Sequence, residues 1–348
     1  MEKIALLTGA GFTKNFGGLL GDQIWSLLYS NPKLQSNDKL RSIFLERDNS
    51  GKRKGYEEIY GKVLDPAFNY SQIEKDIIKL LINEIYSLQE RLIECQSNKW
   101  QHITHALGRF IGSFVTDFFT LNQDLFIEKE LSKLFTNIKH NHVDIKEPQI
   151  PSRPRLYLDT IQLPSSNSVN KIEFDSNNIV RYFKLHGSIN WFDSITGKNK
   201  VIIGGGDNDK REQIEKEPLL IEYLEYFERC LGDYTYLLII GYSFHDYHIN
   251  NIIESKIVNN NLKVIVIDKS SPGNDILDNM LPIKDKHYIV PSPNPANKII
   301  RARLASRLYG LYLVDSLYDL FILETGKANE LFKVIVKNMD IDDKPLFE

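Results

Sequence analysis

The sequence has few of the residues that define several common classes of protein. Its 348 residues include only two cysteines, Cys95 and Cys230, too few for a disulfide framework or a four-cysteine zinc site. Positive and negative side chains nearly balance, 43 against 46, so no overall positive field draws the chain to nucleic acid. We therefore expect a reduced, cytoplasmic protein without direct sequence-specific nucleic-acid binding.

Long apolar runs are also absent. The longest, such as Tyr236–Ile240, fall far short of the ~20 residues that span a bilayer. The first residues lead directly into a strand-like segment and do not have the layout of a signal peptide. We expect no membrane association, and the length suits one large domain or a core that carries an insertion.

Short apolar segments alternate with segments of helical periodicity. The expected strands are residues 3–8, 114–120, 179–185, 236–240 and 262–267. One face of a long amphipathic helix is expected to carry Ile73, Ile77, Leu80, Leu81, Ile85, Leu88 and Leu92. The alternation predicts an α/β fold with a doubly wound, Rossmann-like parallel sheet.

The expected domain organisation has three parts. Residues 1–30 and 105–290 form the Rossmann-like domain, and residues 31–104 form a helical insertion. Residues 291–348 form a mainly helical C-terminal segment, packed on the core or used in assembly. Within the main domain, residues 138–178 are rich in Pro, Asn and Ser, which predicts an irregular crossing or a peripheral hairpin.

Polar residues and glycines follow the expected strands. In an open α/β sheet, ligands bind outside the carboxyl ends of the strands, so these residues are the candidates for a site. They are Gly9 to Thr13, Asn122 with Asp124, His186, Gly241 to Ser243, and Asp268.

Each candidate has two interpretations when it is taken alone. The glycines before Thr13 allow a tight turn and close approach of backbone N–H groups to a diphosphate. However, Lys14 occupies the position of the third glycine in the usual nucleotide-binding pattern, so a purely structural turn is the alternative. Asn122 and Asp124 are either turn formers or ligands for a ribose and an amide. His186 is either structural or, with an ordinary pKa near 6.5, able to transfer protons.

Five short segments in this order resemble the sirtuin family. They are Gly9-Ala10-Gly11-Phe12-Thr13, Thr120-Leu121-Asn122-Gln123-Asp124, Lys184-Leu185-His186-Gly187-Ser188, Gly241-Tyr242-Ser243 and the strand end at Asp268. Residues 9–18 and 240–250 look most similar to bacterial sirtuin-like proteins of anti-phage defence. Those proteins are NAD hydrolases, and some are paired with a HerA-like ATPase or an Argonaute.

The resemblance implies NAD+ as substrate and assigns roles to residues. Asn122 would orient the reacting ribose and the attacking water, and His186 would act on the ribose hydroxyls or the water. The residues implied in NAD binding are Gly9, Ala10, Gly11, Phe12, Thr13, Thr120, Asp124, Gly241, Ser243 and Asp268. A homo-oligomer, with a HerA-like ATPase or another defence partner, is also implied.

The sequence departs from the deacylating sirtuins at two places. Leu121 replaces the glutamine usual in deacetylases, and Cys230 alone stands where two zinc-binding cysteine pairs would lie. We therefore expect no zinc module and no metal. The reaction expected is that of an NAD+ glycohydrolase, which uses water to release nicotinamide and ADP-ribose. The resemblance implies that this activity depletes NAD in antiviral defence. An NAD-dependent protein deacylase and a non-catalytic sensor of NAD or ADP-ribose remain as alternatives.

Two histidine groups look like metal ligands. His245, Asp246 and His248 have suitable side chains, but Asp246 is expected to cap the following helix or to support the site from behind. His102 and His105 share a helical face without further ligands, so packing or a surface position is expected.

Overall fold

A computed structural model describes residues 4–47, 51, 53–128, 138–140, 161–162, 180–193, 198–201, 207–268, 310–313 and 317. Its main sheet has seven strands in the order β10-β9-β8-β1-β2-β5-β3, and every neighbouring pair is parallel. The bounds are β1 Ile4–Thr8, β2 Val115–Thr120, β3 Ile138–His140, β5 Val180–Lys184, β8 Tyr236–Ile240, β9 Lys263–Asp268 and β10 Gly310–Leu313.

This strand order confirms the predicted fold class. Without the edge strand β3, the order β5-β2-β1-β8-β9-β10 is that of a Rossmann sheet, third, second, first, fourth, fifth and sixth along the chain. The order reverses between β1 and β8, so the ligand crevice of such a fold is expected beyond the ends of these two strands. A second sheet contains β4 Ile161–Gln162, β6 Gly187–Asp193 and β7 Lys198–Val201.

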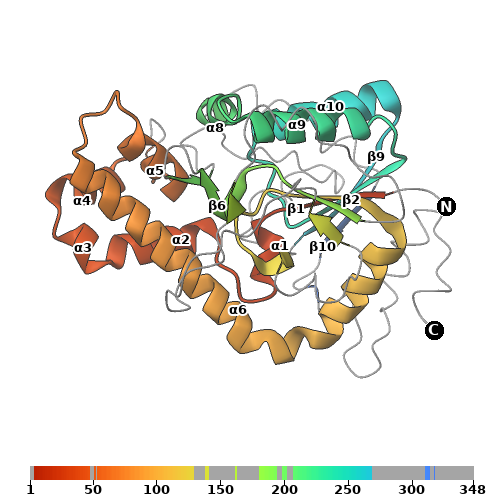
Figure 1. The fold of residues 1–348 in the computed structure, drawn as a ribbon, viewed down its shortest axis with the longest axis horizontal. Coiled ribbons are helices and arrows are strands. Elements are labelled where there is room, and N and C mark those ends of the chain that lie inside the picture. Colours follow the sequence, from red (N-terminus) through yellow and green to blue (C-terminus); the bar gives the residue numbers. More distant parts are fainter. Residues whose placement is uncertain are drawn as a thin grey trace.

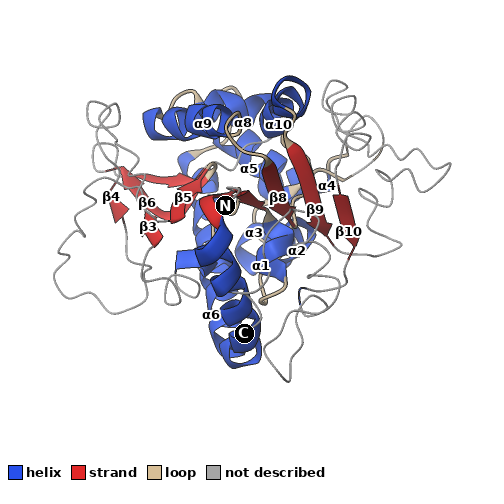
Figure 2. Cartoon of the chain, turned by 90° about the vertical axis from the view of Figure 1, so that its right-hand side faces the viewer, coloured by secondary structure: helices blue, strands red, loops and turns tan. Residues whose placement is uncertain are grey.

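Helices cover both faces of the main sheet (Figures 1 and 2). Side chains alternate along β1, so that Ile4 and Leu6 join one buried cluster and Ala5 and Leu7 join another. The first cluster includes residues of the helices α1 (Ala10–Lys14) and α6 (Gln72–Phe114). The second lies under α9 (Pro218–Cys230) and α10 (Tyr247–Asn260), beside which α8 (Asp207–Ile214) packs.

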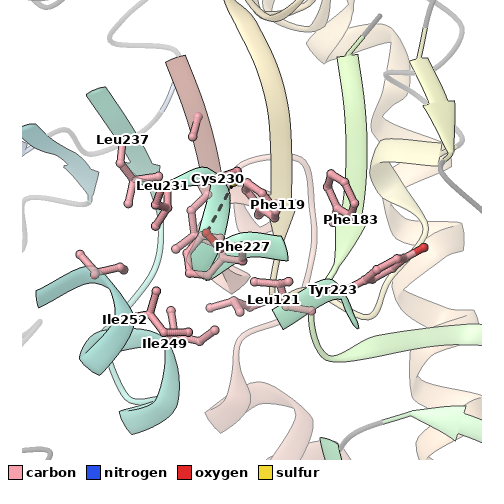
Figure 3. Packing of buried hydrophobic residues seen from close by; sticks show 14 of the residues in the cluster. Phe119, Leu121, Phe183, Tyr223, Phe227, Cys230, Leu231, Leu237, Ile249 and Ile252 are labelled. Atoms are coloured by element: carbon pink, nitrogen blue, oxygen red, sulfur yellow. Dashed lines mark hydrogen bonds between the residues drawn. The ribbon is translucent and has the colours of Figure 1, made fainter. Parts of the chain in front are cut away.

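The cluster under α9 and α10 is rich in aromatic side chains. Figure 3 shows Phe119 and Phe183 on the sheet facing Phe227 of α9, with Ile249 and Ile252 of α10 nearby. The rings of Phe119 and Phe227 meet edge to face, with their centroids 4.8 Å apart. These contacts fix α10, and with it the loop that joins β8 to α10, against the sheet.

The remaining helices form a group with its own hydrophobic core. They are α2 (Gly21–Ser30), α3 (Pro32–Gln35), α4 (Asp38–Leu45), α5 (Tyr56–Leu64) and the first half of α6. In Figure 1, α6 runs from this group, bends, and continues to the start of β2, an inner strand of the sheet. Although α6 has 43 residues, neither it nor any other described helix has a stretch apolar enough to cross a membrane.

The buried face of α6 agrees with the predicted one only in part, because Leu81 and Ile85 are buried as expected but other positions differ. Ile73 is 72% exposed and Leu80 is 46% exposed, whereas Ile78 and Ile82 are buried. The helix packs on its neighbours through a stripe that also contains buried polar residues, among them Gln89. A search for apolar periodicity misses such polar residues, so the predicted and observed faces coincide only in part.

The expected domain division stays a prediction. Residues 31–104 are helical over most of their described length, but α6 continues without interruption to Phe114 and ends where β2 begins. The C-terminal segment, expected to be mainly helical, supplies β10. His105 is exposed on α6, as expected, and the side chain of His102 lies outside the described residues.

Candidate functional site

The strand ends that carry the candidate residues lie side by side and in register. Thr8 of β1 pairs with Thr120 of β2, which in turn pairs with Lys184 of β5. Asn122 and His186 each follow their paired strand residue by two positions. On the other side of β1, Thr8 pairs with Ile240 of β8, which pairs with Ile267 of β9, one residue before Asp268.

The glycines at the switch point allow the start of α1 to contact the loop that follows β8. A Cβ atom on Gly9 would lie 2.7 Å from the carbonyl oxygen of Gly241, and one on Gly11 would lie 2.9 Å from the Gly241 Cα. Gly241 has a φ of +63°, and a Cβ there would lie 2.2 Å from the backbone nitrogen of Phe12. The N–H of Gly11 donates to the Gly241 carbonyl oxygen at 2.9 Å.

These contacts change the role assigned to Gly11. Because its N–H is already paired with Gly241, it is not free to approach a diphosphate as the sequence pattern predicts. Phe12 is fully buried and packs edge to face on Phe16 and Phe118, so its side chain belongs to the core. Ala10 and Ser243 are exposed at this end of the sheet, and the Ser243 hydroxyl lies 2.8 Å from Nδ1 of His245.

Asn122 is held by both of its amide hydrogens. Its Nδ2 donates to the carbonyl oxygen of Gly9 at 2.9 Å and to the Thr13 hydroxyl at 2.8 Å. Its backbone N–H donates to the Thr120 hydroxyl, which also accepts from the hydroxyl of Thr8. Among the described residues no group donates to Asn122 Oδ1, so this oxygen is left to accept a hydrogen bond from a ligand or a water.

The same Thr13 hydroxyl also connects to Asp124. Burial raises the pKa of the Asp124 carboxyl, although nearby Lys184 and hydrogen bonds from the Phe126 N–H and the Thr13 hydroxyl work in the opposite direction. Lys184, which is buried, donates to the backbone carbonyl of Asp124 and forms an ion pair of 2.7 Å with Glu128. The loop after β2 is therefore fixed from inside the protein.

His186 contacts a histidine to which the sequence motifs assign no role. Its Nε2 lies 3.1 Å from Nε2 of His248, in the first turn of α10, and both side chains are buried. Burial lowers the pKa of His186 to about 3 and that of His248 to about 4; Asp246 opposes both shifts and Lys210 adds to them. Both imidazoles are therefore neutral near pH 7.

Asp246 occupies the N-cap position of α10, but its side chain does not cap the helix. Its Oδ1 instead forms an ion pair of 2.7 Å with Lys210 of α8, whose ammonium also lies 2.7 Å from Glu57 of α5. Burial would raise the pKa of the Asp246 carboxyl, but Lys210 and the two histidines hold it well below its usual range. The predicted cap is thus wrong, whereas a supporting position behind His186 agrees with the structure.

The helical group reaches the site through a second contact. The hydroxyl of Tyr86 on α6 donates to Oε1 of Gln123 at 2.5 Å, and Gln123 stands between Asn122 and Asp124. The core of the helical group also includes Leu125, directly after Asp124, and Ile189, three residues after His186. The sequence patterns indicate no role for these residues, because Tyr86 and Gln123, like Glu57 and Lys210, lie far apart in the chain.

The described residues contain no group of three His, Cys, Asp or Glu side chains suited to a metal ion. Cys230 is buried on α9, where burial raises the pKa of its thiol and its sulfur contacts the carbonyl of Phe227 at 3.5 Å. A thiol in this environment stays protonated, and metal binding needs the thiolate. Asp268 is half-buried at the end of β9, which pairs with β8, the strand that Gly241 follows.

The family model for the SIR2-like domain matches residues 116–288. This segment contains Asn122, Asp124, His186, Gly241 and Asp268, while Gly9 to Thr13 lie before it. The match supports a sirtuin-like family and, in general terms, an NAD-related function of the sirtuin type. No curated protein sequence matches the chain.

Proposed function

We propose that this protein is an NAD+ glycohydrolase. In the proposed reaction the bond between the ribose C1′ and the nicotinamide nitrogen breaks, and a water oxygen bonds to C1′. The electron pair of the broken bond stays on nicotinamide, which leaves neutral, and the water gives up a proton to solvent. The products are nicotinamide, ADP-ribose and a proton.

The observation that carries this proposal is the state of Asn122. Two donated hydrogen bonds, to Gly9 and to Thr13, fix its amide and direct Oδ1 away from the protein partners described above. An oxygen fixed in this way can hold a water or a ribose hydroxyl, and correct positioning is a major source of rate enhancement. His186 follows the neighbouring strand β5 at the register-equivalent position, so the two side chains can act on one ribose.

The role in defence is also a proposal. It rests on the similarity of residues 9–18 and 240–250 to sirtuin-like NAD hydrolases of anti-phage systems. We propose a homo-oligomer that depletes cytoplasmic NAD together with a HerA-like ATPase or a similar partner. Because unrestrained hydrolysis would poison the host, we expect assembly or the partner to control the activity.

The test measures nicotinamide and ADP-ribose after NAD+ is incubated with the protein, in each oligomeric form and with its genomic neighbour. Asn122→Ala and His186→Ala should each lose turnover by ~10²-fold or more, because the ribose and the water would no longer be held in position. The matched control variants Asn83→Ala and His105→Ala change exposed residues of α6, so their turnover of NAD+ should equal that of the parent. The proposal fails if neither product forms under any condition, or if the site variants match the parent.

The same samples separate the two alternatives. A deacylase would remove the acyl group from an acyl-lysine peptide only when NAD+ is present, and would form little ADP-ribose without the peptide. A sensor would bind NAD+ or ADP-ribose without forming nicotinamide. Calorimetry with ADP-ribose, run beside the turnover assay, distinguishes binding alone from hydrolysis.

A further inference from the structure

Two buried imidazoles share one hydrogen bond at the candidate site. His186 follows β5 and His248 lies on α10, and their Nε2 atoms are 3.1 Å apart, with the rings tilted by 43°. A hydrogen bond between two neutral imidazoles needs one N–H and one lone pair. The tautomers of the two residues are therefore linked: the proton lies on Nε2 of one ring and on Nδ1 of the other.

The surroundings of His248 select between the two arrangements. Its Nδ1 is buried and has no hydrogen-bond partner among the described residues. If Nδ1 carried the proton, a buried N–H would be left without an acceptor, and such orphaned donors are rarer in proteins than acceptors that lack a donor. The arrangement with the lower free energy therefore places the proton of His248 on Nε2 and leaves the lone pair on Nδ1.

We propose that His248 is a positioning residue that donates its Nε2–H to His186 and thereby holds His186 in the tautomer protonated at Nδ1. His186 then presents a hydrogen-bond donor, and no free lone pair, toward a ligand at the strand ends. This deepens the proposed function, on which it rests: His186 holds an oxygen of the NAD ribose, or the water, instead of removing a proton. Asn122 Oδ1 supplies the complementary acceptor.

The tautomer is measured without NAD. Protein labelled with ¹⁵N-histidine is examined by NMR at neutral pH, where protonated and unprotonated ring nitrogens have well-separated shifts and distinct couplings to the ring carbon-bound protons. The spectra of His186→Gln and His248→Gln assign the two rings. We expect His186 to be protonated at Nδ1 and His248 at Nε2; the opposite pattern, or two charged rings, overturns the inference.

Variants of His248 then test the link to the reaction. His248→Gln can donate an amide N–H from nearly the same place, whereas His248→Phe fills the space without a donor. We expect His248→Phe to lose kcat by ~10–100-fold, as the loss of one partner from a buried hydrogen bond implies, and His248→Gln to recover most of it. In ¹⁵N spectra of His248→Phe, His186 should no longer be restricted to the Nδ1–H tautomer.

The controls separate this inference from the proposed function. His105→Gln, on the exposed face of α6, should leave the spectra of both rings and kcat unchanged. If the tautomers are as expected but no nicotinamide forms, the glycohydrolase proposal fails and the positioning role of His248 stands. If His248→Phe folds, keeps parental kcat and leaves His186 in the Nδ1–H tautomer, the positioning role fails, whatever the reaction is.

Discussion

The buried histidine pair should make the stability of the protein depend on pH. In the folded protein the pKa values are about 3 for His186 and about 4 for His248, against an ordinary value of 6.5. Both histidines have a lower pKa in the folded protein than in the unfolded chain. Between pH 6.5 and about pH 4, the unfolded chain therefore binds more protons at these two residues than the folded protein does. The free energy of unfolding therefore falls as the pH falls through this window.

The size of the effect follows from the protonation of the unfolded chain. A histidine with an ordinary pKa is about one quarter protonated at pH 7 and nearly fully protonated at pH 5. In the folded chain both rings stay mostly neutral over this range. Linkage then gives a loss of ~2 kcal/mol for each histidine, or ~4 kcal/mol for the pair, on going from pH 7 to pH 5.

The assay is urea unfolding at pH 7 and pH 5, followed by tryptophan fluorescence. Carboxylates and other histidines also contribute, so the comparison is between the parent and His248→Gln, in which those groups are unchanged. The parent should lose ~2 kcal/mol more than His248→Gln over this pH range. Equal losses in the two proteins would refute the reasoning, since His248 would then titrate alike in the folded and unfolded chains.

Two other perturbations test the contacts around the site. Gly241→Ala places a Cβ on a backbone with a positive φ and against the first turn of α1. We therefore expect its free energy of unfolding, measured with urea, to fall by at least ~1–3 kcal/mol. Gly55→Ala is the control, because a Cβ at Gly55 would meet no atom within 4 Å. Lys210→Met leaves the Asp246 carboxylate buried without its cation, with an expected cost of ~3–5 kcal/mol. The double variant Lys210→Met/Asp246→Leu should regain much of this loss; additive losses would contradict a direct coupling of the two charges.

Much of the fold could be predicted because the strands are short apolar runs between polar residues. The buried strands β1 and β8 consist almost entirely of apolar side chains, as expected for parallel strands covered on both faces. Since parallel strands end at a common edge, polar residues after each run could also be placed together. Asn122 and His186 are found at equivalent positions for this reason.

Other features depend on pairings that a sequence pattern does not contain. Gly9 and Gly11 match a pattern for diphosphate binding, but the structure shows that their missing side chains make room for Gly241, more than 200 residues away. The neighbours of His248 in the chain suggest only a metal cluster or a helix cap. Its partner is instead His186, which is 62 residues away in the chain.

The two contacts from the helical group show that the site depends on more than the Rossmann sheet. Tyr86 holds Gln123, which is bonded directly to Asn122 and Asp124 in the chain, and Glu57 shares Lys210 with Asp246. The hydrogen bond between Tyr86 and Gln123 is buried, and the Lys210 ammonium that Glu57 contacts is largely buried, which strengthens both interactions relative to exposed ones. Removing the helices would therefore leave Gln123 without Tyr86 and Lys210 without Glu57, and would release both sides of the site. A chain shortened to the sheet and its covering helices would retain the residues of the motifs but lose contacts that orient them, so NAD+ turnover should require the full chain.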